Sequence, residues 1–132
     1  MVTEPLIAVI DDDESVRKAL IRLLRSANLA GLAFPSARAF LEVFTDLPID
    51  CIVLDLQMPD MTGLELQRHL RVHHPNLRMP VIVITAHDEP GSRERCIAAG
   101  ASAYLRKPVE SSVLLAVINE VTAAADNDRV HA

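Results

Sequence analysis

The chain has 132 residues, of which 50% are hydrophobic and 23% are charged, with no tryptophan and a formal net charge of −5. This length fits one domain that can bury a core without disulfides or a structural metal. The negative charge argues against direct binding of nucleic acid, which needs a basic face. No apolar run approaches the roughly 20 residues needed to span a membrane, and residues 1–5 lack the features of a signal peptide. We therefore expect a compact, soluble, cytoplasmic protein.

Short apolar runs recur along the chain and alternate with helical patterns. The β-α alternation predicts an α/β protein with a parallel sheet and helices on both faces, and right-handed crossovers make the sheet doubly wound. The runs are rich in Val, Ile and Leu, which fits strands that are buried on both sides. The five predicted strands are Leu6–Ile10, Leu32–Phe34, Cys51–Leu54, Val81–Ile84 and Ala103–Leu105.

Apolar residues at helical spacing predict the helices between these strands. Ser36 and Thr62 are candidate N-caps for the second and third helices, and Gly100 is a natural end for the fourth. We expect a single domain over residues 1–122, followed by a polar tail or the start of a linker over residues 123–132. The predicted helices cover approximately residues 16–27, 37–44, 64–70, 91–99 and 110–125.

Chemically capable side chains follow every predicted strand but the second. In a parallel sheet the carboxyl ends of the strands meet at one edge, so these side chains can converge on one pocket. The aspartates offer hard oxygen ligands with excess negative charge, as Mg²⁺ requires, and the lysine offers a mobile positive charge for a phosphoryl oxygen. The residues are Asp11, Asp12, Asp13 and Glu14 after the first strand, Asp55 after the third, Thr85 after the fourth and Lys107 after the fifth.

Each of these residues also has an ordinary structural interpretation. A single Asp after a strand is more often a turn residue than a ligand, and Asp13 can simply begin a helix, because acids favour the first turn. Thr85 is a common type of strand residue, and Lys107 can be a solvated lysine. These interpretations do not explain why all of the features fall at one edge of the sheet.

Several motifs resemble the response-regulator receiver domain of two-component signalling, over a match from about Leu6 to Val121. The segments around Phe34-Pro35-Ser36-Ala37 and Ile82-Val83-Ile84-Thr85 are similar to the nitrogen-fixation type of transcriptional regulator. The resemblance implies a flavodoxin-like, five-stranded sheet of order 2-1-3-4-5. The matching motifs are Val9-Ile10-Asp11-Asp12-Asp13, Leu54-Asp55-Leu56-Gln57-Met58-Pro59-Asp60-Met61-Thr62-Gly63, Ile84-Thr85-Ala86, Ala98-Ala99-Gly100-Ala101 and Tyr104-Leu105-Arg106-Lys107-Pro108.

The resemblance also implies a role for each matching residue. Asp55 would accept a phosphoryl group from a sensor histidine kinase, and Thr85 and Lys107 would hold the phosphoryl oxygens. Asp12 would bind Mg²⁺ directly, Asp11 largely through water, and the remaining metal ligands would be Asp55 itself and the carbonyl of Gln57. The run of aspartates leaves Asp12 and Asp13 as an alternative acid pair, although the end of the apolar run favours Asp11 and Asp12.

The expected output is a change of conformation. We expect Thr85 to move toward the phosphoryl group and Tyr104 to follow it inward. This movement would alter the surface of the fourth helix, fifth strand and fifth helix, a candidate surface for a homodimer or an output partner. Gln57 and His87 are candidates for setting the lifetime of the phosphoryl group, although His87 can equally be a solvent-exposed loop residue.

Other classes of protein fit the same residues less well. A Mg²⁺-dependent phosphohydrolase would usually carry a second carboxylate two residues beyond the nucleophile, where this chain has Gln57. A receiver-like binding module that works without phosphorylation would normally lack one of the acids or the lysine, and this chain has them all. A switch that carries a phosphoryl group, rather than a turnover enzyme, is therefore the favoured interpretation.

Overall fold

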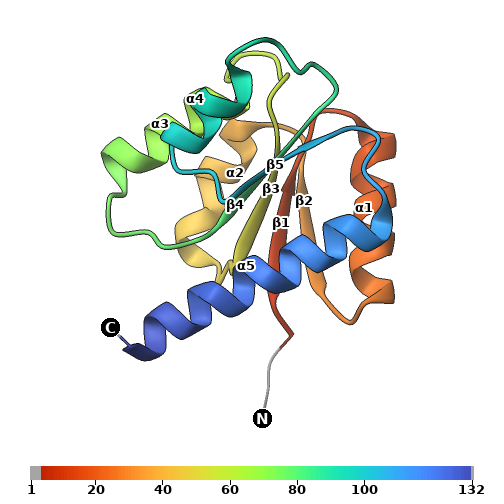
Figure 1. Ribbon diagram of the computed structural model, residues 1–132, viewed down its shortest axis with the longest axis vertical. Helices are drawn as coiled ribbons and strands as arrows, with labels where there is room; N and C mark the ends of the chain where they lie inside the picture. The colour runs from red at the N-terminus through yellow and green to blue at the C-terminus, as the bar shows by residue number, and fades with distance from the viewer. Residues whose placement is uncertain (1–3, 132) are drawn as a thin grey trace.

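The computed structural model describes residues 4–131, with side chains through residue 126. It consists of a central parallel sheet with helices on both faces (Figure 1). No helix within residues 4–131 combines the length and the apolar character needed to cross a membrane. The elements are β1 Leu6–Ile10, α1 Glu14–Ser26, β2 Ala30–Phe34, α2 Ala37–Val43, the 3-10 helix η1 Phe44–Asp46, β3 Cys51–Asp55, α3 Gly63–His73, β4 Val81–Thr85, α4 Ser92–Ala98, β5 Ala103–Arg106 and α5 Ser111–His131.

The strands lie in the order β2-β1-β3-β4-β5, and every neighbouring pair is parallel. This confirms the predicted order and the doubly wound α/β class. The register pairs Ile10 with Leu54 and Asp55 with Ile84, so β1, β3 and β4 end side by side. The residues that follow these strands are therefore brought to the same edge of the sheet.

Successive strand residues face opposite sides of the sheet and divide the apolar interior into two cores. Helices α1 and α5 cover one side and helices α2, α3 and α4 cover the other (Figure 1). The α1–α5 core consists of Ile7, Val9, Leu24, Leu29, Cys51, Val53, Ile82, Ile84, Leu114 and Ile118. The main members of the α2–α4 core are Ala8, Ile10, Phe34, Phe40, Phe44, Ile52, Leu54, Leu66, Leu70, Val83, Cys96 and Tyr104.

Both predicted N-caps are confirmed. The Ser36 hydroxyl accepts a hydrogen bond from the Ala39 N–H at 3.1 Å and begins α2. Thr62 and Glu65 form a reciprocal capping box at the start of α3, with bonds of 3.2 and 3.1 Å between side chain and backbone. Polar side chains of the sequence thus fix where two helices begin, and the start of α3 matters for the site because it directly follows β3.

Most elements begin or end one to three residues away from their predicted bounds, and β2 and α5 show two reasons for such differences. β2 begins at Ala30, two residues before the predicted Leu32, because Ala30 and Gly31 pair with Leu6 and Ile7 although Ala and Gly favour strands weakly. α5 runs to His131 rather than to about Ala125, so it includes most of the predicted polar tail. The division into a domain over residues 1–122 and a tail stays a prediction, and residues 1–3 and 132 lie outside the described part of the chain.

Candidate functional site

Asp55 is the last residue of β3 and is only 4% exposed, although it lies at the edge of the sheet. The chain turns back toward the end of β3 after Asp55. The Gly63 N–H at the start of α3 donates to the Leu56 carbonyl oxygen at 3.0 Å. A side chain at position 63 would collide with the Asp55 carbonyl oxygen and the Leu56 Cα. Glycine at this position therefore allows α3 to begin directly against the backbone of Asp55 and Leu56.

Asp11, Asp12 and Asp55 form a cluster in which one carboxylate oxygen of each lies within 4.8 Å of the others. Asp11 is fully buried and Asp12 is exposed, so the cluster opens to solvent on one side. Asp13 is instead the N-cap of α1, because its Oδ1 accepts the Ser15 N–H at 2.8 Å. The geometry therefore brings the first two of the three aspartates to Asp55, as the end of the apolar run indicated.

Lys107 reaches this cluster from the end of β5. Its Nζ lies 2.8 Å from Asp11 Oδ2 and 3.7 Å from Asp55 Oδ1, and its backbone N–H is held by the Thr85 carbonyl oxygen at 2.8 Å. Burial alone would lower the pKa of Lys107, but the hydrogen bond to Asp11 and the charge of Asp55 raise it above its ordinary value. The lysine is therefore charged and is placed between two of the carboxylates.

The pKa of Asp55 is raised from 3.8 to about 6, chiefly by burial and then by the charge of Asp11. Lys107 and the Gln57 N–H, which lies 3.4 Å from Asp55 Oδ1, lower this pKa without cancelling the rise. The cluster thus holds more negative charge than its lysine balances. Three carboxylates with hard oxygen donors and a deficit of positive charge suit Mg²⁺. Asp11, Asp12 and Asp55 are the residues that would hold the ion, and the Gln57 carbonyl stays a predicted further ligand.

Thr85 and His87 lie beside each other at the end of β4. The Thr85 side chain is fully buried, and its Oγ1 accepts the His87 N–H at 3.0 Å and donates to the His87 carbonyl oxygen at 3.2 Å. The hydroxyl is therefore tied to its own loop, while His87 itself is exposed. The predicted roles of Thr85 in holding the phosphoryl group and of His87 in its lifetime stay predictions.

The predicted switch residue Tyr104 is already inside the protein, with 6% of its surface exposed. Its hydroxyl lies 3.0 Å from Asp88 Oδ1 and 3.1 Å from Ser92 Oγ. Asp88 also pairs with Arg106, whose Nε lies 3.4 Å from Asp88 Oδ2. The expectation that the ring moves inward therefore differs from this structure, in which two hydrogen bonds already hold it there. Asp88 and Ser92 were not identified from the sequence, because only folding brings them to Tyr104.

Residues 7–119 match the response regulator receiver domain. The chain belongs to this family. It is 35% identical to Nodulation protein W of Bradyrhizobium diazoefficiens over 96% of this chain and 54% of that protein. It is 36% identical to the transcriptional regulatory protein FixJ of Rhizobium meliloti over 96% of this chain and 63% of that protein. The receiver domain thus spans little more than half the length of these curated relatives.

Solved structures support the same assignment. The crystal structure of a response regulator receiver protein from Burkholderia phymatum is 43% identical, with a TM-score of 0.79 over 91% of this chain and 96% of that one.

Response-regulator receiver domains are signalling switches rather than turnover enzymes. They are phosphorylated by histidine kinases and bind Mg²⁺ at an acidic pocket, which here is the cluster of Asp11, Asp12 and Asp55.

Proposed function

We propose that this receiver domain is a phosphorylation switch in which Asp55 accepts a phosphoryl group from a phosphohistidine of a sensor histidine kinase. The observation that carries the proposal is the setting of Asp55. A carboxylate that is 4% exposed ends a central strand, beside a lysine ammonium and within a cluster of three acids. Structural ion pairs seldom place so many like charges together, because the carboxylates repel one another without a cation.

In the proposed reaction, an oxygen of the Asp55 carboxylate attacks phosphorus as the nucleophile. The oxygen–phosphorus bond forms as the bond from phosphorus to the histidine nitrogen breaks, and the electron pair of that bond returns to the imidazole. Transfer of this kind depends on alignment and on charge neutralisation rather than on a strong base. The Lys107 Nζ, 3.7 Å from Asp55 Oδ1, is placed to balance charge on the transferred oxygens.

Mg²⁺ bound at Asp11, Asp12 and Asp55, with the Gln57 carbonyl as a further ligand, would supply the remaining positive charge. The Thr85 hydroxyl would turn from the His87 backbone to a phosphoryl oxygen. Attack by water on the phosphoryl group would later return Asp55 to its free form. We propose that Gln57 and His87, both of which are exposed, tune the rate of this step from the open side of the site.

The proposed output is a change in the surface formed by α4, β5 and α5, which would control a homodimer or an output partner. Arg106 already pairs with Asp88 on this surface, and Asp88 accepts the bond from Tyr104. Through Asp88, Tyr104 therefore connects the buried side of α4 to charged side chains that a partner can contact. The names of its relatives, which include transcriptional regulatory proteins, support an output in transcription through another domain. The net charge of −5 supports the proposal that this chain does not bind nucleic acid directly.

The test is phosphate uptake from a small-molecule phosphodonor, followed by intact-mass analysis. We expect the parent chain to gain one phosphoryl group in the presence of Mg²⁺ and little or none with EDTA. Asp55→Asn is expected to gain none. The matched control is Asp46→Asn, which changes an exposed acid of η1 and is expected to behave as the parent. Uptake by Asp55→Asn equal to that of the parent would show that another residue is the acceptor.

A further inference from the structure

Three histidines lie near the C-terminal end of α3. His69 and His73 are four residues apart, so their side chains lie one above the other on the same face of the helix. Their ring centres are 4.4 Å apart, and the rings are tilted by 41° rather than stacked. The ring of His74 lies 6.5 Å from that of His69 and packs edge-on against Phe44 at 4.9 Å. The helix therefore presents one close pair of imidazoles, with the third ring in a separate contact.

The ring nitrogens of the His69–His73 pair are available to a ligand. Among the side chains that the structure describes, neither ring forms a hydrogen bond or an ion pair. Gln67 Oε1 is the only buried side-chain nitrogen or oxygen in this part of the chain that has no partner, so the unpartnered imidazole nitrogens are open to solvent. Each neutral imidazole has one nitrogen that can accept. The pair therefore offers two nitrogen ligands side by side.

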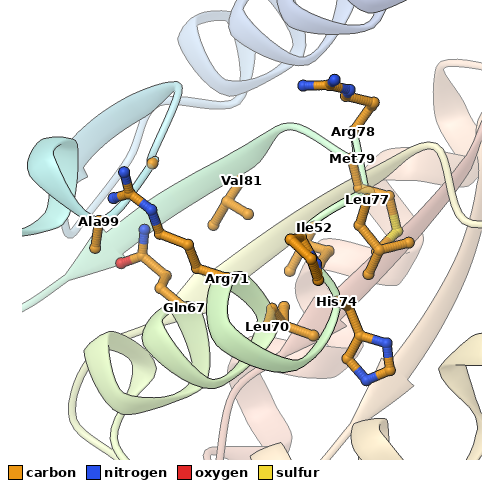
Figure 2. A pocket seen from close by; sticks show the side chains of 12 residues that line it. Ile52, Gln67, Leu70, Arg71, His74, Leu77, Arg78, Met79, Val81 and Ala99 are labelled. Carbon is orange, nitrogen blue, oxygen red and sulfur yellow. The ribbon is translucent and has the colours of Figure 1, made fainter.

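The positive charges of α3 point away from the imidazole pair. At about 100° per residue, Arg68 and Arg71 leave the helix on other sides, and Arg71 donates to the Ala98 carbonyl oxygen of α4 at 2.6 Å. Figure 2 shows the side chain of Arg71 and the ring of His74 pointing in different directions. The helix ends at His73, where the negative end of its dipole favours a bound cation. The pair is thus placed where a metal ion is stabilised rather than repelled.

We propose that His69 and His73 together bind a divalent transition-metal ion, and that Cu²⁺ binds most tightly. Metal–nitrogen bonds of about 2.1 Å that meet at a right angle place two imidazole centres roughly 4.5 Å apart, and the observed separation is 4.4 Å. A right angle suits the square-planar sites of Cu²⁺ and Ni²⁺, and Cu²⁺ forms the most stable complexes of the first-row divalent ions. Water would fill the remaining positions. The site uses none of the groups around Asp55, so it stands or falls independently of phosphoryl transfer.

Titration of the chain with Cu²⁺, followed by backbone amide NMR, tests this site. Cu²⁺ is paramagnetic and broadens the signals of residues near it. The titration is made in excess Mg²⁺, which competes for the carboxylates around Asp55 because it prefers oxygen ligands. We expect the signals around residues 69–73 to broaden first and to saturate. Ni²⁺ is expected to act on the same residues at higher concentration, and Mg²⁺ alone is expected to leave them unchanged.

Histidine variants separate a chelating pair from binding by any surface histidine. His69→Gln and His73→Gln are each expected to weaken Cu²⁺ binding about tenfold or more, because one imidazole alone cannot chelate. The matched control is His74→Gln, which removes an imidazole from the same end of α3 and is expected to stay within about twofold of the parent. His73 is exposed, so its variant tests the site even if His69→Gln folds poorly. Binding by His73→Gln that equals the parent, or an equal loss in His73→Gln and His74→Gln, would overturn the proposal.

Discussion

At the scale of single residues, Asp55 has few positive charges within reach. Among the described residues Lys107 alone forms an ion pair with it, and the same ammonium lies closer to Asp11. Burial and Asp11 therefore keep the pKa of Asp55 at about 6. Without a metal ion, the ionised carboxylate is a source of instability in the folded chain.

The pH dependence of folding tests this. Because the folded pKa of Asp55 is raised, the unfolded state loses its proton first as the pH rises, and the stability of the folded chain falls between pH 3.8 and about 6. In EDTA, we expect Asp55→Asn to match the parent below this window. Above it, the variant should exceed the parent by at most ~3 kcal/mol in the free energy of unfolding. Denaturant unfolding at several pH values measures this. A variant less stable than the parent above the window would contradict the assigned pKa.

The residues of the cluster could be predicted from the sequence because each lies at the end of an apolar run or within two residues of it. The end of the apolar run at Ile10 was enough to favour Asp11 and Asp12 over Asp13. Gln67 and Ser92 could not be predicted in this way, because their partners are distant in the sequence. Gln67 bonds to Cys96, 29 positions away, and Ser92 meets Tyr104, 12 positions away. Such contacts depend on how α3, α4 and β5 pack, which no local pattern of residues records.

At the scale of elements, α4 is a short helix, Ser92–Ala98, with an attachment at each end. Near its start, Ser92 bonds to Tyr104 of β5, and at its end the Ala98 carbonyl accepts a bond from Arg71 of α3. A helix of this length gains little stability from its own backbone. Its position is therefore decided by these contacts and by the packing of Cys96 in the α2–α4 core.

Loss of the contacts to Tyr104 should release the ring. Tyr104 is the only tyrosine of a chain without tryptophan, so intrinsic fluorescence reports on it alone. We expect acrylamide to quench this fluorescence more strongly in Asp88→Ala and Ser92→Ala than in the parent. Each variant is expected to lose about 1 kcal/mol of unfolding free energy for its lost hydrogen bond. The control is Asp46→Ala, which changes an exposed residue of η1. Equal quenching in all of these chains would show that the two bonds do not hold the ring.

The strands could be predicted because each apolar run coincides with one strand, whereas the ends of the elements were harder to predict. The start of β2 depends on its neighbour β1 and not on its own residues, since Ala30 and Gly31 are weak strand formers. The end of α5 was placed too early because Asp126, Asn127 and Asp128 indicate a loop, yet the helix continues through them to His131.

At the scale of the whole molecule, the sheet separates the α1–α5 core from the α2–α4 core. Substitutions in different cores are therefore expected to act independently. Ile10 belongs to the α2–α4 core and Ile118 to the α1–α5 core, and both are fully buried. Each change to Val is expected to cost about 1 kcal/mol of unfolding free energy.

Denaturant unfolding of the double variant measures this independence. We expect the costs of Ile10→Val and Ile118→Val to add within about 0.5 kcal/mol. The comparison pair is Ile7→Val with Ile118→Val, two residues of the same core, for which a larger departure from additivity is expected. Strong coupling between Ile10 and Ile118 would show that the sheet transmits packing changes from one face to the other.

The parallel order of the strands could be predicted because a repeated β-α pattern leaves few other topologies. The division of the interior into two cores gives the surface of α4, β5 and α5 an asymmetric construction. α4 packs on one core and α5 on the other. The two helices therefore depend on different sets of apolar contacts. A displacement of α4 would leave the packing of α5 on the α1–α5 core unchanged. A partner that binds across both helices would therefore respond to the distance between α5, which stays in place, and α4, which moves.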